Sequence, residues 1–407
     1  MIVNPGHSAE VLDRKEGRIL IGVQLTSDEV YRCCFQTRRA AYELAVEEIN
    51  RSGGILGRKA DLVFWDFGSD IRLASRQAWD LVENEKVDVL MGGLLSSARE
   101  EIRRVADKTH TPYFFNSLYE GGVADHYTFF TSIVPEQGIF PALDYLIPRY
   151  GTRCYILVAD YNYGILNAER LKRYLSLQGL TPVALEYFFT EKSVFDVTIS
   201  NILQTLPDII IMICAGKYQN EFHRQWHEKG LRSIPVFASI GVPISGLHRT
   251  FPAPTMENNY FMCSYQEDMD TEPAAAFTQA MKDRTGGMYI DMDSESAYTA
   301  VHLYKNAVEL AGTTETEAVI RALESGRIHF NGPGGNVIVR GEDHHVIRDV
   351  ALYRTSANHN NELIAMYPSI YSDYVEQVLR TETGAVHGLA SLGRKAPNTQ
   401  YNPMYHT

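Results

Sequence analysis

Short apolar segments alternate with amphipathic segments along the first 240 residues of the chain. Four apolar segments occupy residues 19–25, 61–65, 87–91 and 112–116, and four more occupy 153–159, 181–188, 208–214 and 235–240. Each is apolar at nearly every position, which indicates strands covered on both faces, as in parallel sheets flanked by helices. Between them, segments such as 37–51 carry apolar residues at helical spacing. The repeated order predicts an α/β protein with two doubly wound parallel-sheet lobes.

The pattern after Pro254 does not start a third lobe. It predicts a strand at 259–264, helices at 273–283, 294–311 and 314–325, and a closing hairpin of 336–340 with 350–354. We expect these segments to complete lobe 1 (17–134 plus 266–328) and lobe 2 (135–265 plus 329–368). Crossings near Val134, Tyr265 and His329 would then form a multi-strand hinge.

Residues 369–407 form the expected C-terminal extension or tail. Its final part is rich in Gly, Pro, Asn, Ser and Thr and shows little periodicity, which is typical of a poorly ordered terminus. The alternative is that the aromatic residues near its end pack on the same chain or on a second copy in a homodimer.

Length, charge and cysteine content exclude several classes of protein. A chain of 407 residues suits two domains, and a net charge of -12 argues against nucleic-acid binding. No apolar segment approaches the roughly 20 residues needed to span a membrane. The first residues do not form a basic region followed by an apolar stretch, as an export signal would. We therefore expect a cytoplasmic protein, or a periplasmic one if a signal peptide has been removed, with five reduced cysteines.

Polar residues follow the predicted strands at the edge where a doubly wound sheet binds its ligand. After the third strand, Gly92-Gly93-Leu94-Leu95-Ser96-Ser97 leads into a helix, whose first N–H groups can bind a carbonyl oxygen, carboxylate or phosphate. Ser97-Ala98-Arg99-Glu100 reads as a capping box. We accordingly assign Ser97 to helix capping and Ser96 to ligand contact.

Two further clusters follow other strands. Tyr119 and Glu120 come after the fourth strand; the tyrosine could stack on a planar ligand, while the carboxylate either selects an N–H donor or is neutralised by a basic group. Asp160, Tyr161 and Tyr163 follow the first strand of the second lobe. This position would face Ser96 across the cleft, where the two tyrosines could close over a small ligand.

Catalytic and cofactor motifs are missing from the sequence. There is no dinucleotide fingerprint, P-loop, His-Glu-x-x-His, Cys-x-x-Cys or Gly-x-Ser-x-Gly motif. The pair His344-His345 is interpreted as a surface feature of the hairpin, because no further Cys or His has ligand spacing near it. The sequence predicts binding without turnover, with no metal and no cofactor.

Several of these segments are similar to those of a known family. They include Ala45-Val46-Glu47-Glu48-Ile49-Asn50, Gly92 with Ser96 and Arg99, Tyr119-Glu120-Gly121, Asp160-Tyr161, Ala297-Tyr298, and Asn331-Gly332-Pro333-Gly334-Gly335-Asn336-Val337. Over residues 17–367 the chain resembles type I periplasmic-binding-protein folds. The resemblance is greatest to the branch that holds AmiC-like amide sensors and the substrate-binding proteins of urea and short-chain-amide ABC transporters.

The resemblance implies a receptor that closes on a small neutral amide, urea or nitrile-related molecule, with Ser96, Tyr119 and Tyr161 as ligand contacts. It implies a sensor that regulates amide- or nitrile-degrading genes through a regulatory protein partner. The alternative is the substrate-binding component of an ABC importer, partnered by a permease, for short-chain amides, urea or branched-chain amino acids. Leu94, where the branch has an aromatic residue, and Lys217 depart from the family pattern.

Overall fold

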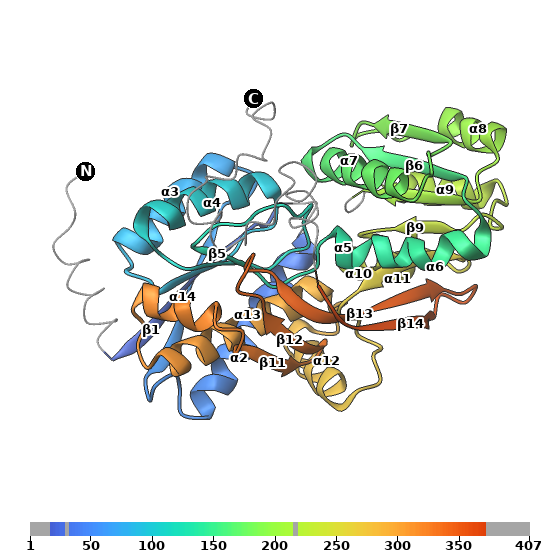
Figure 1. Ribbon diagram of the computed structural model, residues 1–407. Helices are drawn as coiled ribbons and strands as arrows, with labels where there is room; N and C mark the ends of the chain where they lie inside the picture. The colour runs from blue at the N-terminus through green and yellow to red at the C-terminus, as the bar shows by residue number, and fades with distance from the viewer. Residues whose placement is uncertain (1–16, 29–31, 215–218, 372–407) are drawn as a thin grey trace.

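The computed structural model describes residues 17–28, 32–214 and 219–371, which form two lobes, each built on its own sheet (Figure 1). The first sheet has the order β2-β1-β3-β4-β5, and all of its pairings are parallel. Its strands are β1 (Arg18–Leu25), β2 (Lys59–Asp66), β3 (Val89–Gly92), β4 (Tyr113–Phe115) and β5 (Thr128–Phe130). Strands β3, β4 and β5 are buried along their whole length; for β3 and β4 the continuous apolar pattern predicts this burial.

The second sheet is mixed. Its parallel part has the order β10-β9-β8-β6-β7, and β13 pairs antiparallel with β10, β12 and β14. The parallel strands are β6 (Cys154–Ala159), β7 (Ala184–Phe188), β8 (Ile209–Ile213), β9 (Val236–Ala238) and β10 (Asn259–Cys263). The remaining strands are β11 (His329–Gly332), β12 (Gly335–Val339), β13 (Val346–Thr355) and β14 (Asn361–Ile370).

Helices cover both faces of each sheet. The first lobe carries α2 (Arg32–Arg51), α3 (Ile71–Glu83) and α4 (Ser96–Thr109), and the late helices α12 (Glu272–Thr285), α13 (Met292–Ala311) and α14 (Thr316–Leu323). Both α12 and α13 pack against α2, so this late segment completes the first lobe. The second lobe carries α5 (Pro135–Gly138), α6 (Phe140–Tyr150), α7 (Asn162–Leu177), α8 (Asp196–Thr205), α9 (Asn220–Glu228), α10 (Gly241–Ser245) and α11 (Leu247–Thr250).

The α/β class with two parallel-sheet lobes is confirmed. Strands β12 and β13 form an antiparallel pair, but β12 pairs with residues 346–348, with Val337 opposite Arg348, and the expected partner segment 350–354 pairs with β10 and β14 instead. The pattern did not predict β5, β11 or β14. Strand β14 ends at Ile370, so it overlaps the start of the expected tail, and residues 372–407 lie outside the described part of the chain. The residue limits of the two lobes stay a prediction.

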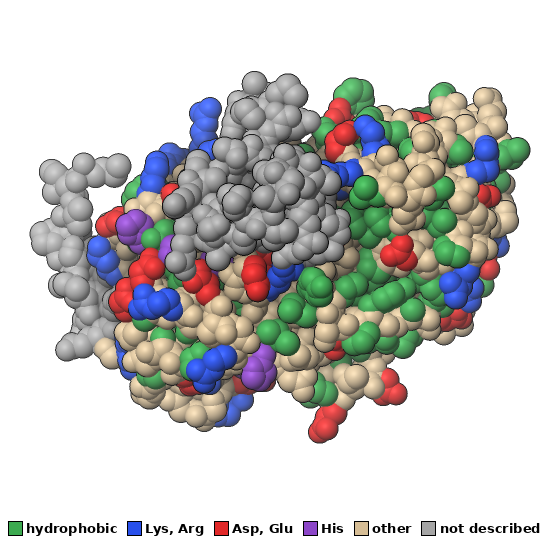
Figure 2. Space-filling model, in the orientation of Figure 1, with side chains coloured by type: hydrophobic (Ala, Val, Ile, Leu, Met, Phe, Trp, Pro, Cys, Tyr) green, Lys and Arg blue, Asp and Glu red, His purple; other side chains and the backbone are tan. Residues whose placement is uncertain are grey.

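Strand β14 is the outer neighbour of β13 and leaves apolar side chains on the surface. Leu363 and Met366 are 55% and 47% exposed. Figure 2 shows hydrophobic side chains gathered on this face over the region of β13, β14 and α6. Inward, Tyr367 donates a hydrogen bond to the carbonyl of Pro141, which ties β14 to α6.

A buried ion pair joins three segments near the junction of the lobes. Arg348 of β13 donates through Nη2 to Oε2 of Glu295 on α13 at 2.7 Å, and both side chains are fully buried. The same guanidinium donates through Nη1 to the carbonyl of Thr131, just after β5, at 2.7 Å. The pair therefore connects the first sheet, the second sheet and α13.

Replacing Arg348 with Met should lower the free energy of unfolding by about 3–5 kcal/mol, because the Glu295 carboxylate would stay buried without its counter-charge. The matched control is Arg354→Met on the same strand, whose partner Glu362 lies at the surface; there we expect a loss of less than about 1 kcal/mol. Urea unfolding of both variants tests this. Equal losses in the two variants would show that the buried pair contributes no more than a surface pair.

Candidate ligand-binding cleft

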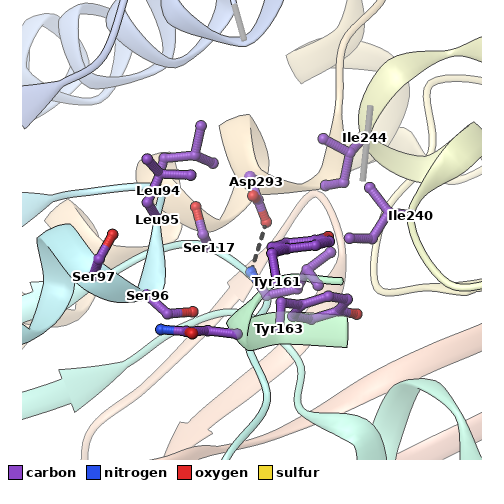
Figure 3. A pocket seen from close by; sticks show the side chains of 12 residues that line it. Leu94, Leu95, Ser96, Ser97, Ser117, Tyr161, Tyr163, Ile240, Ile244 and Asp293 are labelled. Atoms are coloured by element: carbon purple, nitrogen blue, oxygen red, sulfur yellow. Dashed lines mark hydrogen bonds between the residues drawn. The ribbon is translucent and has the colours of Figure 1, made fainter. Parts of the chain in front are cut away.

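A cleft of about 350 Å³ lies between the two lobes (Figure 3). The first lobe contributes residues in and just before the start of α4 and residues shortly after β4. The second lobe contributes the start of α7 and residues in and just before α10. The start of α13 supplies one further residue, Asp293. The lining consists of Leu94, Leu95, Ser96, Ser97, Ser117, Leu118, Tyr161, Asn162, Tyr163, Ile240, Ile244 and Asp293. The strand ends of both sheets thus meet at one site, as expected for doubly wound sheets.

The turn between β3 and α4 brings backbone N–H groups to the cleft. Gly92 has a φ of +97°, and a Cβ atom there would lie 2.3 Å from the carbonyl oxygen of Gln24, so only glycine fits. The N-cap of α4 is Leu95, with no side-chain cap, and Ser96 and Ser97 stand in the first helical turn. The predicted capping role of Ser97 is wrong, because the helix begins one residue before it. Both serines line the cleft instead.

Glu120 lies behind Ser96 and is paired with a buried arginine. The Ser96 hydroxyl donates to Oε2 of Glu120 at 2.7 Å, and Nη2 of Arg99 donates to Oε1 at 2.8 Å. Arg99 is fully buried and Glu120 is 1% exposed. Of the two interpretations of Glu120, the structure therefore shows the one in which a basic group neutralises the carboxylate, and Glu120 is not part of the cleft lining.

Tyr119 is buried beside the cleft and does not line it. Its hydroxyl is 2.5 Å from Nε2 of His345, and its ring stacks on Phe130 with the centroids 4.6 Å apart. The guanidinium of Arg99 also lies over the Tyr119 ring, 4.5 Å from its centroid. Tyr119 instead borders a separate void of about 10 Å³. A ligand in the main cleft would contact its neighbour Leu118.

The histidine pair is also internal, so its interpretation as a surface feature is wrong. His344 and His345 are 5% and 2% exposed, and their rings stack on Phe129 and Phe130 respectively. They lie just before β13, where the chain approaches the first lobe and the backbone carbonyl of His344 accepts from the Phe130 N–H. Aromatic packing against β5, a strand that the sequence pattern missed, explains their burial.

The second lobe contributes two tyrosines. Tyr161 and Tyr163 both line the cleft, with ring centroids 6.2 Å apart and an interplanar angle of 27°. The Tyr163 hydroxyl donates to Ser239 at 3.4 Å, and burial raises the pKa of this phenol well above its ordinary value. Asp160 is exposed and is not part of the lining, and Lys217 lies outside the described residues.

Asp293 is a cleft residue that the sequence did not reveal. Its Oδ1 accepts from the Leu118 N–H and the Ser132 hydroxyl, each at 3.1 Å, and its Oδ2 accepts from Nη2 of Arg38 at 2.5 Å. Burial raises its pKa to about 6, while Arg38 acts in the opposite direction. The predicted helix began at Ser294, so Asp293 read as a residue of the preceding loop. Only the docking of α13 against α2 brings it to the cleft.

The remaining unpredicted lining residues are Leu95, Ser117, Leu118, Asn162, Ile240 and Ile244. Three of them adjoin residues that the sequence did select: Leu95 beside Ser96, Leu118 beside Tyr119, and Asn162 beside Tyr161. Ile240 and Ile244 follow β9, and the sequence analysis did not select them because they are apolar. Within the described ranges, no three His, Cys, Asp or Glu side chains are grouped to hold a metal ion. Likewise, no described helix is long and apolar enough to cross a membrane.

Two hinged α/β lobes with a cleft at their strand ends define a type I periplasmic-binding-protein fold. The chain belongs to the periplasmic binding protein family, since the family model matches residues 19–360.

Solved structures with the same fold include three transport proteins. An ABC transporter substrate-binding protein from Sphaerobacter thermophilus is 21% identical, with a TM-score of 0.75 and coverage of 86% of this chain and 98% of that chain. A solute-binding protein from Rhodopseudomonas palustris HaA2, in complex with p-hydroxybenzoic acid, is 18% identical, with a TM-score of 0.76 and coverage of 88% of this chain and 98% of that chain. The branched-chain amino acid transporter substrate-binding protein LivJ from Streptococcus pneumoniae, in complex with isoleucine, is 20% identical. Its TM-score is 0.75, and the match covers 85% of this chain and 99% of that chain.

The Asp293 carboxyl group should titrate with a pKa of about 6 in the folded protein, compared with an ordinary value of 3.8. Because the folded value is the higher one, this group stabilises the fold most in acid. Its contribution is lost as the pH rises through about 6. NMR titration of the side-chain carboxyl ¹³C shift measures the pKa.

The Arg38→Gln variant should raise the pKa of Asp293 further, since it removes the positive charge that favours ionisation. Arg39→Gln, at an exposed neighbour that pairs with Glu43, is the matched control and should leave the pKa unchanged. A lower pKa in Arg38→Gln would contradict the assignment.

Proposed function

We propose that this protein is the substrate-binding component of an ABC importer and that it closes on one small molecule with an apolar body. The observation that carries the proposal is the cleft itself, about 350 Å³ in volume and lined from both lobes. That size is within the usual range of small-molecule sites. A ligand that contacts both lobes stabilises the closed form, and closure can signal occupancy to a permease.

The lining supports a ligand with a branched or aromatic body. Leu94, Ile240 and Ile244 provide apolar surface, and Tyr161 and Tyr163 provide ring faces. Urea or acetamide would leave much of that surface without contact, so we expect a larger molecule than either. The solved relatives named above are transport proteins, and two of them hold isoleucine or p-hydroxybenzoic acid, molecules of suitable size.

The importer is favoured over the gene-regulating sensor that the resemblance to amide sensors suggested. The family match and the transport proteins with the same fold support the transport function. An import function also places the mature protein outside the cytoplasm. The expectation of a cytoplasmic sensor with a regulatory partner gains no support from the comparisons.

A ligand panel tests the cleft directly. Isobutyramide, valine, 4-hydroxybenzoate and urea are added at equal concentration, and we expect at least one ligand with an apolar body to raise the melting temperature and reduce the radius of gyration. A ligand at 100 times its Kd stabilises a protein by about 2.7 kcal/mol. No shift with any of them, and no closure in X-ray scattering, would argue against this function.

Filling the cleft should abolish that response. We expect Ile244→Trp to remove the thermal shift, because the indole would occupy the ligand volume. Leu203→Trp, on the exposed side of α8, is the control and should respond like the wild type. Deleting the gene should then reduce uptake of the same ligand by the source cell. Altered expression of amide-degrading genes with normal uptake would instead favour the sensor.

A further inference from the structure

The two lobes also touch outside the ligand cleft, through Arg170 of α7. Its Nη1 donates to both carboxylate oxygens of Glu136 on α5, at 3.0 and 3.3 Å. The side chains of Arg170 and Glu136 are buried, with 8% and 4% exposed, and neither belongs to the cleft lining. Because α5 begins directly after the crossing near Val134, the pair lies at the side of the second lobe next to the hinge.

The surface that receives this guanidinium is a pair of glycines in the first lobe. Gly121 and Gly122 lie in the segment between β4 and β5. A Cβ atom at Gly121 would lie 2.3 Å from Nη1 of Arg170 and 3.2 Å from Nη2, and one at Gly122 would lie 3.1 Å from Nη2. The guanidinium thus lies against bare backbone of the other lobe, at a place where even a methyl group lacks room.

Both sides of this contact belong to segments that also line the cleft. Arg170 lies on α7, and Tyr163 near the start of the same helix lines the cleft from the second lobe. Gly121 follows shortly after Leu118, which lines it from the first lobe. A hinge motion that separates these two parts of the lining moves α7 away from the glycine segment, and it therefore separates Arg170 from the glycines as well.

We propose that Arg170 and the backbone of Gly121 and Gly122 form a contact specific to the closed form, so that Arg170 determines ligand affinity without touching the ligand. The inference rests on the proposed ligand-binding function and adds a residue to its closing motion. A contact made only in the closed form favours closure, and a ligand that requires closure then binds more tightly. Glu136 stands in the same lobe as Arg170, so opening leaves neither charge without its partner.

Three glycine-to-alanine variants separate this contact from backbone strain. Gly121, Gly122 and Gly179 have φ values of +74°, +86° and +73°, so alanine is strained at each of them. They differ in the room for a methyl group, because a Cβ atom would lie 2.3 Å from Arg170 at Gly121, 3.1 Å at Gly122, and more than 4 Å from any neighbour at Gly179. Gly179 lies just after α7 and is the matched control.

Calorimetry measures the affinity of each variant for a probe. The probe is whichever of isobutyramide, valine, 4-hydroxybenzoate and urea gives the wild type its largest thermal shift. We expect the affinity to fall at least about tenfold in Gly121→Ala and by a smaller factor in Gly122→Ala, and to stay at the wild-type value in Gly179→Ala. Equal affinities in the three variants would overturn the inference.

The ligand-free proteins show whether the contact belongs to the closed form. Ligand-free Gly121→Ala should melt at the same temperature as Gly179→Ala, because its methyl group meets no guanidinium while the lobes are apart. In X-ray scattering, Gly121→Ala should need a higher probe concentration than the control before its radius of gyration decreases. A lower melting temperature with unchanged affinity would show that the contact persists in the open form, which overturns the inference.

Arg170→Lys covers the case in which Gly121→Ala does not fold. Lysine keeps a positive charge beside Glu136 but lacks the planar guanidinium, so we expect the affinity to fall at least about threefold. Arg224→Lys, at an exposed arginine on α9 that pairs with Glu221 and Glu228, is the control and should bind like the wild type. Unchanged affinity in Arg170→Lys would overturn the inference and leave the proposed function intact. If no probe binds the wild type and none causes closure, the proposed function fails, and this inference fails with it.

Discussion

Three arginine–carboxylate pairs are buried where the two lobes meet: Arg38 with Asp293, Arg99 with Glu120, and Arg348 with Glu295. A buried charge is tolerated only with a partner, so each pair fixes the segments that carry it. Through them, α2, α4, α13, β13 and the segment after β4 have defined relative positions at the cleft and the hinge. The geometry of the cleft depends on this constraint, while the apolar cores hold each lobe together.

Two of the pairs also hold hydroxyl groups that line the cleft. Ser96 donates its hydroxyl proton to Glu120, and the Ser117 hydroxyl accepts from Arg38, so both side chains have fixed partners in the fold. The pairs at the cleft thus fix side chains of its lining, while Arg348 joins the segments at the junction of the lobes. Leu94 and Ile244 form apolar walls that limit the size and shape of a molecule in the cleft.

The hydrophobic pattern was sufficient to predict the parallel strands, because strands buried on both faces are apolar at nearly every position. The same pattern was insufficient to predict β5 and β14. Strand β5 is only three residues long, and β14 is an exposed outer strand whose pattern mixes apolar and polar positions. The two histidines before β13 were misplaced for the same reason, since their burial depends on packing against β5.

The sequence by itself determined the α/β class, the two lobes and the strand ends from which Ser96, Tyr161 and Tyr163 reach the cleft. These features follow from local patterns, because the residues within each strand and helix show its type and the chain shows the succession of these elements. Only the tertiary structure decided that Tyr119 is internal, that Glu120 faces an arginine and that Asp293 lines the cleft. Those outcomes depend on contacts between distant segments, and burial gives each charge a partner that no local pattern specifies.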